Sequence, residues 1–82
     1  MREPITRGGS TIGYFSREDG NLILDTYGTG KGRFIESDKC IVDTYGTIVG
    51  YYDYYGKVVD RDRNVVCSYD GNPALAAAEL LL

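Results

Sequence analysis

Histidine and tryptophan are both absent from this chain of 82 residues. Histidine is the commonest general base in enzymes and the commonest side-chain ligand of protein-bound metals. Without it, the serines and cysteines of the chain have no imidazole to activate them as nucleophiles. These absences argue against an enzyme, and we expect no catalytic residue, no cofactor and no metal site.

Cysteine is scarce, and Cys40 and Cys67 follow no C-x-x-C spacing. That spacing argues against a zinc site, so we expect two reduced, half-buried thiols, with a disulfide between them as the alternative. The first ten residues contain no apolar core of the kind that a signal peptide carries. No apolar run approaches the roughly 20 residues that span a bilayer. We therefore expect a cytoplasmic protein without a membrane span.

Basic residues are fewer than acidic ones, with 9 Lys and Arg against 12 Asp and Glu, and the net charge is -3. This balance argues against non-specific nucleic-acid binding. The length fits a single domain covering residues 1–82. A domain this small buries only a modest share of its surface, so a partner chain is one of the usual sources of extra stability.

Glycine and tyrosine are abundant, with 11 and 8 residues respectively. The pattern Asp-x-Tyr-Gly occurs at Asp25–Gly28, Asp43–Gly46 and Asp53–Gly56. The chain divides into similar units with a period of about 17 to 19 residues, which fits one β-hairpin per unit. The units cover, approximately, residues 11–28, 29–46, 47–63 and 64–72.

Three columns of residues align between these units, one of them an apolar pair followed by Asp, and the other two predict a common face of the sheet. A small residue recurs in each unit, at Gly13, Gly32, Gly50 and Cys67. An aromatic residue follows two positions later, at Phe15, Phe34, Tyr52 and Tyr69. Because residues i and i+2 of a strand share a face, both columns point the same way, and we expect the rings to lie over neighbouring glycine backbones. The residues between them suit a wetter face, and they are Tyr14, Arg33, Tyr51 and Ser68.

Turn signals fall about every 8 to 12 residues, as is typical of an all-β chain. The short connections favour antiparallel pairing between neighbours. We therefore predict an antiparallel meander of about seven short strands followed by a helix, with a small closed barrel as the alternative. The predicted strands cover residues 11–15, 21–25, 32–36, 40–43, 47–52, 57–60 and 64–69.

The C-terminal segment predicts a helix over residues 73–82. Asn72 is a good N-cap, and Pro73 suits the first helical position. Glu79 is its one charged residue, so the helix must be covered on most sides. We expect it to pack on the sheet and also either to meet a second chain or to plug an end of the sheet. The residues predicted to mediate self-association are Leu75, Leu80, Leu81 and Leu82.

The Asp-x-x-Gly pattern has a structural interpretation that we favour. Type I turns prefer Asp at their first position and Gly at the fourth, and the Asp side chain accepts a hydrogen bond from the backbone two residues on. The functional alternative is a row of carboxylates that binds Ca²⁺ or a sugar. The stretch Asp60–Asn64 opens like an EF-hand loop, but Val65 stands where Gly is needed and Gly71 where the closing Glu is needed.

Two further segments contain candidate binding residues. Three glycines lie around Lys31 in the sequence, and their backbone N–H groups could form a nest for an anion. The spacing of these residues does not match a P-loop. The second segment holds five tyrosines within eleven residues, and tyrosine is favoured both in binding surfaces and in strands. If one sheet face binds a ligand or partner, the predicted contact residues are Tyr14, Lys31, Arg33, Tyr51 and Tyr54.

Glycine, Ile-Val pairs and Asp-x-x-Gly alternate over residues 46–60, ahead of an Ala/Leu-rich tail over residues 74–82. This arrangement resembles small bacterial proteins built of G-x-I-V-x-D-x-x-G-x-x-V-G hairpin repeats. The resemblance implies a β-repeat fold and carries no activity. Our leading hypothesis is a non-enzymatic interaction module that forms a homodimer or a larger homo-oligomer. The alternative is a binding domain for nucleic acid or another anionic ligand, centred on Lys31, Arg33 and nearby tyrosines.

Overall fold

The computed structural model describes residues 2–53 and 55–82. Within them the chain forms an antiparallel meander in which each strand pairs with the next one in sequence. The strands are β1 (Arg2–Arg7), β2 (Ser10–Ser16), β3 (Leu22–Leu24), β4 (Gly30–Ile35), β5 (Cys40–Asp43), β6 (Ile48–Tyr52), β7 (Lys57–Asp60) and β8 (Val65–Ser68). Helix α1 (Pro73–Leu81) follows them. The predicted meander and terminal helix are thus confirmed.

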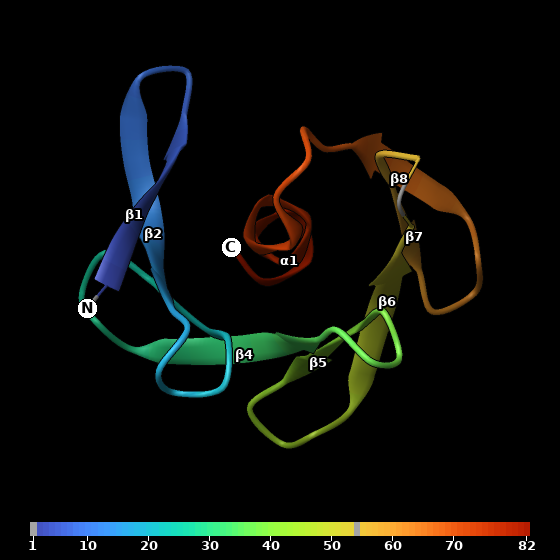
Figure 1. Cartoon of the computed structure of the whole chain (residues 1–82), viewed down its shortest axis with the longest axis horizontal. Coiled ribbons are helices and arrows are strands. Elements are labelled where there is room, and N and C mark those ends of the chain that lie inside the picture. Colours follow the sequence, from blue (N-terminus) through green and yellow to red (C-terminus); the bar gives the residue numbers. More distant parts are fainter. Residues whose placement is uncertain (1, 54) are drawn as a thin grey trace.

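The sheet curls around α1 as an open half-barrel, with the helix at its centre (Figure 1). Strands β1 and β8 are the two edges of the sheet and do not pair with each other, so the closed-barrel alternative is wrong. The molecule is a thick disc of 30 × 28 × 17 Å. Its thinnest dimension matches the rise of a strand of about five residues. Short strands and a short helix therefore fit one another in length.

Strand β1 is the element that the sequence did not predict. It contains Pro4, begins at Arg2 and ends at Arg7, whereas strand signals are runs of alternating β-branched and aromatic residues. Of its residues, Ile5 is buried and pairs with Gly13 of β2. Proline and charged side chains are common on edge strands, where they prevent pairing with other chains. The proline and the charged residues that give β1 no strand pattern are therefore suited to an edge strand.

The aromatic column forms one continuous row on the inner face, as its spacing predicts. Its ring centroids are separated by 5.4 Å between Phe15 and Phe34, 6.1 Å between Phe34 and Tyr52, and 6.2 Å between Tyr52 and Tyr69. The rings belong to the same core cluster as the buried alanines of α1. Small helix residues leave room for large rings at this level of the curl. These alanines are Ala74, Ala76, Ala77 and Ala78.

The glycine column faces the last turn of α1, and this corrects the prediction that aromatic rings cover the glycines. A Cβ added to Gly13 would lie 2.7 Å from Leu82, one on Gly32 would lie 2.9 Å from Leu81, and one on Gly50 would lie 2.4 Å from Leu80. Consecutive helix residues point about 100° apart, so successive leucines meet successive hairpins of the curl. Large side chains of α1 thus fill the space above the glycines.

Glu79 continues this pattern to the fourth hairpin and links the two edges of the sheet. It lies by Cys67, the small residue of β8, whose thiol has a pKa raised by burial and then by the charge and hydrogen bonding of Glu79. Its Oε1 also lies 2.7 Å from the Arg7 guanidinium of β1. A partly exposed ion pair of this kind contributes at most about 1 kcal/mol. The contact nevertheless spans the seam that the strands leave open.

Helix α1 begins as predicted, with the Asn72 side chain accepting a hydrogen bond from the Ala74 N–H at 3.0 Å. Its own sheet covers it: four alanines are at most 1% exposed, and Leu75, Leu80 and Leu81 pack against the core cluster. Leu82 is 40% exposed. The helix therefore plugs the curl, and its apolar character no longer argues for self-association through these leucines. None of the described helices is long and apolar enough to cross a membrane.

Candidate functional site: tyrosine-tipped turns

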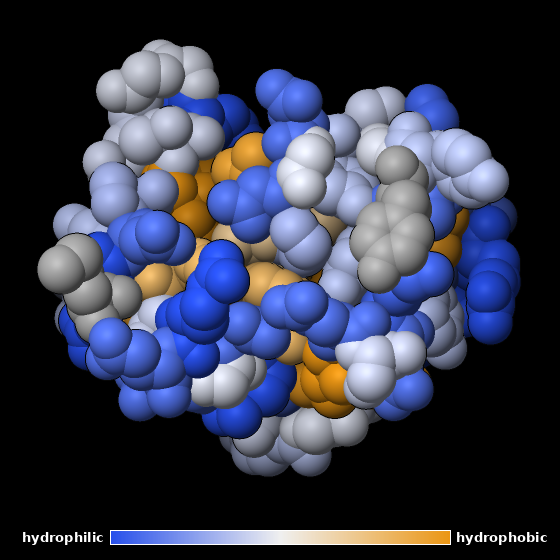
Figure 2. All heavy atoms as spheres, viewed as in Figure 1, coloured by the Kyte–Doolittle hydropathy of each residue, from blue (hydrophilic) through white to orange (hydrophobic). Residues whose placement is uncertain are grey.

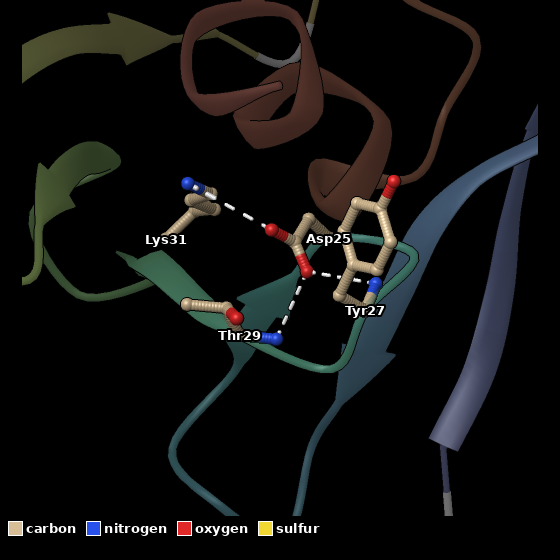
Figure 3. Close-up of polar contacts among 4 residues, drawn as sticks. All are labelled: Asp25, Tyr27, Thr29 and Lys31. Atoms are coloured by element: carbon tan, nitrogen blue, oxygen red, sulfur yellow. Dashed lines mark hydrogen bonds and ion pairs between the residues drawn. The ribbon is translucent and has the colours of Figure 1, made fainter.

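The Asp-x-Tyr-Gly stretches form turns in which the Asp side chain organises the backbone. Asp25 Oδ1 accepts hydrogen bonds from the N–H groups of Tyr27 and Thr29, each at 2.9 Å (Figure 3). The Gly28 N–H donates to the Asp25 carbonyl at 3.0 Å, and the Asp25 N–H donates to the Thr29 carbonyl at 2.9 Å. Gly28 has φ +84°, which favours glycine at this position. The predicted structural role of Asp and Gly is thus confirmed.

The same turn is built four times. Asp43 Oδ1 accepts from Tyr45 and Thr47 at 2.9 and 3.0 Å, and Asp53 Oδ1 accepts from Tyr55 and Lys57 at 3.0 and 2.9 Å. The fourth copy begins at Asp60, whose Oδ1 accepts from the N–H groups two and four residues on, both at 2.9 Å. That stretch is the EF-hand-like segment, and its first carboxylate is committed to the turn.

A tyrosine stands at the tip of the first three turns, with its side chain in solvent. Tyr27 is 93% exposed, and Tyr45 and Tyr55 are each 91% exposed. The tips carrying Tyr27 and Tyr45 have the same five-residue sequence, Asp-Thr-Tyr-Gly-Thr. Both follow odd-numbered strands and therefore lie at one end of the antiparallel sheet, whereas Tyr55 follows β6 and lies at the other end.

A pocket of about 320 Å³ adjoins the Tyr27 tip. The turn contributes Thr26, Tyr27 and Gly28, while β1 contributes Arg2 and β2 contributes Tyr14. The Arg2 guanidinium lies against the tip, because a Cβ added to Gly28 would come within 3.3 Å of its Nη1. The predicted contact residue Tyr14 thus lines a pocket. Arg2 escaped prediction together with its strand.

Lys31 and Arg33 do not converge on a common site. Lys31 Nζ lies 3.8 Å from Asp25 Oδ2, so its charge is paired within the turn (Figure 3). The Thr29 N–H, assisted by the Tyr27 N–H and by Lys31, lowers the pKa of Asp25. Arg33 extends toward the turn between β2 and β3, where its Nη1 would lie 2.9 Å from a Cβ on Gly20.

The other predicted residues lie elsewhere. Tyr51 is half-buried on the outer face, where the Arg63 guanidinium stacks over its ring at 4.5 Å from the centroid. Tyr54 lies outside the described residues. Strand alternation does not predict the tip tyrosines, because they lie in turns and not in strands. The turn pattern does indicate them, since the third residue of a four-residue turn lies at its tip.

The remaining chemistry is sparse in the part of the chain that the structure describes. Both thiols are free, Cys40 buried and Cys67 half-buried, so they form no disulfide. Burial is the main cause that raises the pKa of each thiol. Within residues 2–53 and 55–82, no three acidic or cysteine side chains are grouped to hold a metal ion.

The surface is hydrophilic over most of the face seen in Figure 2, with apolar residues in separate patches. Comparison with known proteins adds no assignment to it. No protein-family model matches the chain. No curated protein and no solved structure matches it either. The exposed tyrosine tips and the pocket beside Tyr27 are therefore the features from which function has to be argued.

Proposed function

We propose that the protein is a non-enzymatic interaction module that binds carbohydrate through its tyrosine-tipped turns. One observation carries the proposal: Tyr27, Tyr45 and Tyr55 are each more than 90% exposed at the same position of equivalent turns. An aromatic ring left in water is a large apolar surface without a partner. Of these rings, Tyr27 and Tyr45 also lie at the same end of the sheet, which points to a common binding role for these two.

The turn itself does not need the ring. The fourth copy has Asp62 at the tip position and makes the same hydrogen bonds from Asp60 Oδ1 to the backbone. The Tyr27 and Tyr45 side chains contribute almost nothing to burial, since they are 93% and 91% exposed. Folding therefore gives no account of these tyrosines. A hydrogen-bonded turn, in contrast, holds the backbone of the tip tyrosine in a fixed position. This reduces the entropy that is lost when a ligand binds.

The chemistry of the two matching tips favours a sugar over a protein partner. Threonines flank each pair of Tyr and Gly residues, and the Asp carboxylate is occupied by backbone N–H groups. Each tip thus offers an exposed ring with threonines beside it in sequence. A sugar stacks its C–H face on a single ring and hydrogen-bonds through its hydroxyls. A protein interface instead needs a continuous buried core, and the net charge of -3 disfavours nucleic acid.

Two tips on one rigid scaffold suit a polymeric ligand. They belong to different hairpins, β3–β4 and β5–β6, so each can contact a separate segment of the same chain. Linking weak contacts in this way raises overall affinity by orders of magnitude when both sites can engage together. We therefore expect soluble polysaccharides to bind more tightly than their short oligosaccharides.

Affinity electrophoresis in native gels containing neutral or acidic polysaccharides tests the proposal. We expect at least one polysaccharide to retard the wild-type protein, Tyr27→Ser and Tyr45→Ser to reduce the retardation, and the double variant to abolish it. Ser37→Ala changes an exposed residue of the turn between β4 and β5, at the opposite end of the sheet, and serves as the control. Absence of retardation across both ligand classes, or retardation that the double variant retains, would overturn the proposal.

Self-association is a second candidate function, and the β8 edge favours it. Val65 is 63% and Val66 48% exposed on this strand, which pairs with β7 along one edge only. Proline and charged residues, in contrast, protect β1. Antiparallel pairing of β8 with β8 of a second copy would give a closed two-fold dimer. Sedimentation velocity at high micromolar concentration should then show a dimer that Val66→Lys dissociates. A strict monomer rules this candidate out.

A further inference from the structure

The pocket beside Tyr27 adds a cation to the tyrosine tip. It is lined by two aromatic residues, Tyr14 and Tyr27, together with Arg2, Thr26 and Gly28. The three contributing segments are β1, β2 and the turn between β3 and β4. Residues far apart in sequence thus meet in one concavity. Aromatic side chains next to polar groups that can fix a ligand's orientation also occur in small-molecule sites.

The Arg2 charge has no acidic partner among residues 2–53 and 55–82. Asp25, the acid nearest to the tip in sequence, is held by two backbone N–H groups and by Lys31. Glu3 follows Arg2 directly, so its side chain leaves the strand on the opposite face. The guanidinium against Gly28 is therefore available to an anionic group of a ligand.

The shape and charge of the Arg2 guanidinium favour one kind of anionic group on the ligand. A guanidinium presents a planar fork of donors that matches a carboxylate through two parallel hydrogen bonds. A single unpaired guanidinium balances the one negative charge of a carboxylate, whereas a phosphate monoester carries nearly two at neutral pH. The nearest other cation at the tip, Lys31, is already paired with Asp25. The pocket thus favours a carboxylate attached to a ring that stacks on tyrosine.

We infer that the Tyr27 tip is selective for acidic sugars, with Arg2 binding the carboxylate of a uronic acid residue while Tyr27 and Tyr14 contact its ring. The pocket volume of about 320 Å³ is at the lower end of the range for small-molecule sites, which suits one sugar unit of a longer chain. The inference rests on the proposed carbohydrate-binding function and adds the class of sugar that the pocket binds.

Trigalacturonic acid and its methyl ester form a matched pair of probes, because they share a backbone and differ in charge. Titrations followed by NMR give a dissociation constant for each. We expect the wild-type protein to bind the acid about tenfold or more tightly than the ester, as one charge-assisted bidentate contact would give. High salt should reduce the difference, since the contact is partly exposed to solvent.

Arg2→Gln tests the residue, and Arg61→Gln on the turn between β7 and β8 is its charge-matched control. We expect Arg2→Gln to bind the acid and the ester equally while keeping the ester affinity of the wild type. Arg2→Lys keeps the charge but not the fork, and should lose most of the preference. Arg61→Gln should retain the tenfold preference within about a factor of two, since a distant surface charge is largely screened.

The outcomes separate the inference from the proposed function. If the wild type binds acid and ester alike, or if Arg2→Gln keeps the preference, the inference fails and tyrosine-mediated carbohydrate binding still stands. If poly-glutamate binds as tightly as trigalacturonic acid, the pocket reads charge alone, and the assignment to a sugar is overturned. If the Tyr27→Ser, Tyr45→Ser double variant binds both probes as the wild type does, both proposals fail together.

Discussion

The inner wall of the curl and the turn tips are built from the same repeat, but only the inner wall is explained by folding. Each glycine of the inner wall faces a leucine of α1 or of its C-cap, and each ring lies beside the next ring. At the tips, the Asp and Gly residues are explained by hydrogen bonds and by a positive φ. The tyrosine between them has no such account. The residues of the inner wall and the Asp and Gly residues of the turns are thus needed for folding, whereas the tip tyrosines are available for binding.

Deletion of a ring from each region gives the largest contrast. Phe34 is 3% exposed and contacts a ring on either side. Phe34→Ala should cost about 3–5 kcal/mol because it removes buried area and leaves a cavity, whereas Tyr45→Ala should change stability by less than about 0.5 kcal/mol. Urea unfolding followed by circular dichroism measures both. If Phe34→Ala does not fold, Phe34→Leu supplies a milder loss, and comparable losses at positions 34 and 45 would refute the division.

Glycine substitutions sharpen the account of the inner wall. A Cβ on Gly50 would lie 2.4 Å from both the Val59 carbonyl oxygen and Leu80, so Gly50→Ala should cost about 1–3 kcal/mol through overpacking. Gly30 also lies in a strand, but the nearest atom to an added Cβ is a Leu22 methyl group at 3.3 Å. Gly30→Ala should therefore be nearly neutral. Equal thermal unfolding midpoints for the two variants would contradict the close packing of α1 on the glycine column.

The turn carboxylates should have smaller effects, because their donors can bond to water instead. Asp43→Ala removes the acceptor for the N–H groups of Tyr45 and Thr47, which by analogy with helix N-caps should cost about 1 kcal/mol. Asp43→Asn keeps an oxygen in the same place and should lose less than half of that. Chemical denaturation of both variants decides the point. An Asn variant as unstable as the Ala variant would show that the charge, not the hydrogen bonds, organises the turn.

Low pH should cause a small loss of stability through the turn that begins at Asp25. Hydrogen bonds from the Thr29 and Tyr27 N–H groups and the nearby Lys31 lower the pKa of Asp25 in the folded protein. A lowered folded pKa means that the stabilisation is present above the ordinary Asp value, near 4, and is lost as the pH falls through the folded value. NMR titration of the Asp25 carboxyl should show the lowered value in the wild type and a return toward the ordinary value in Lys31→Gln. An unshifted wild-type value would contradict the turn geometry.

Much of the fold follows from local sequence signals. The sequence predicts the strands at residues 40–43 and 57–60 with their observed bounds, because each lies beside an Asp-x-Tyr-Gly turn. Strand β1 could not be predicted, since Pro4 and its charged residues carry no strand pattern and only pairing with β2 orders them. The partners of the glycines depend on contacts between residues 80–82 and three distant hairpins. No local pattern encodes contacts of that range.

The candidate site was less accessible to sequence reasoning. Alternation within strands predicts Tyr14 and Tyr51 as contact residues, and the structure places Tyr14 in the pocket and Tyr51 under Arg63. Lys31 was expected to bind an anion, yet Asp25, six residues earlier, pairs with it. Arg2 reaches the Tyr27 tip only because β1 lies beside β2 in the curl. A pocket assembled from three segments becomes visible only once the sheet topology is known.

The double variant Tyr27→Ser, Tyr45→Ser tests the central claim most directly, because it is read for stability and for binding in the same preparation. Both rings are more than 90% exposed, so the urea midpoint should stay at the wild-type value. Retardation by polysaccharide in native gels should disappear. A lowered midpoint would mean that the rings support the fold after all. An unchanged midpoint with unchanged retardation would mean that the exposed tyrosines are not the binding groups.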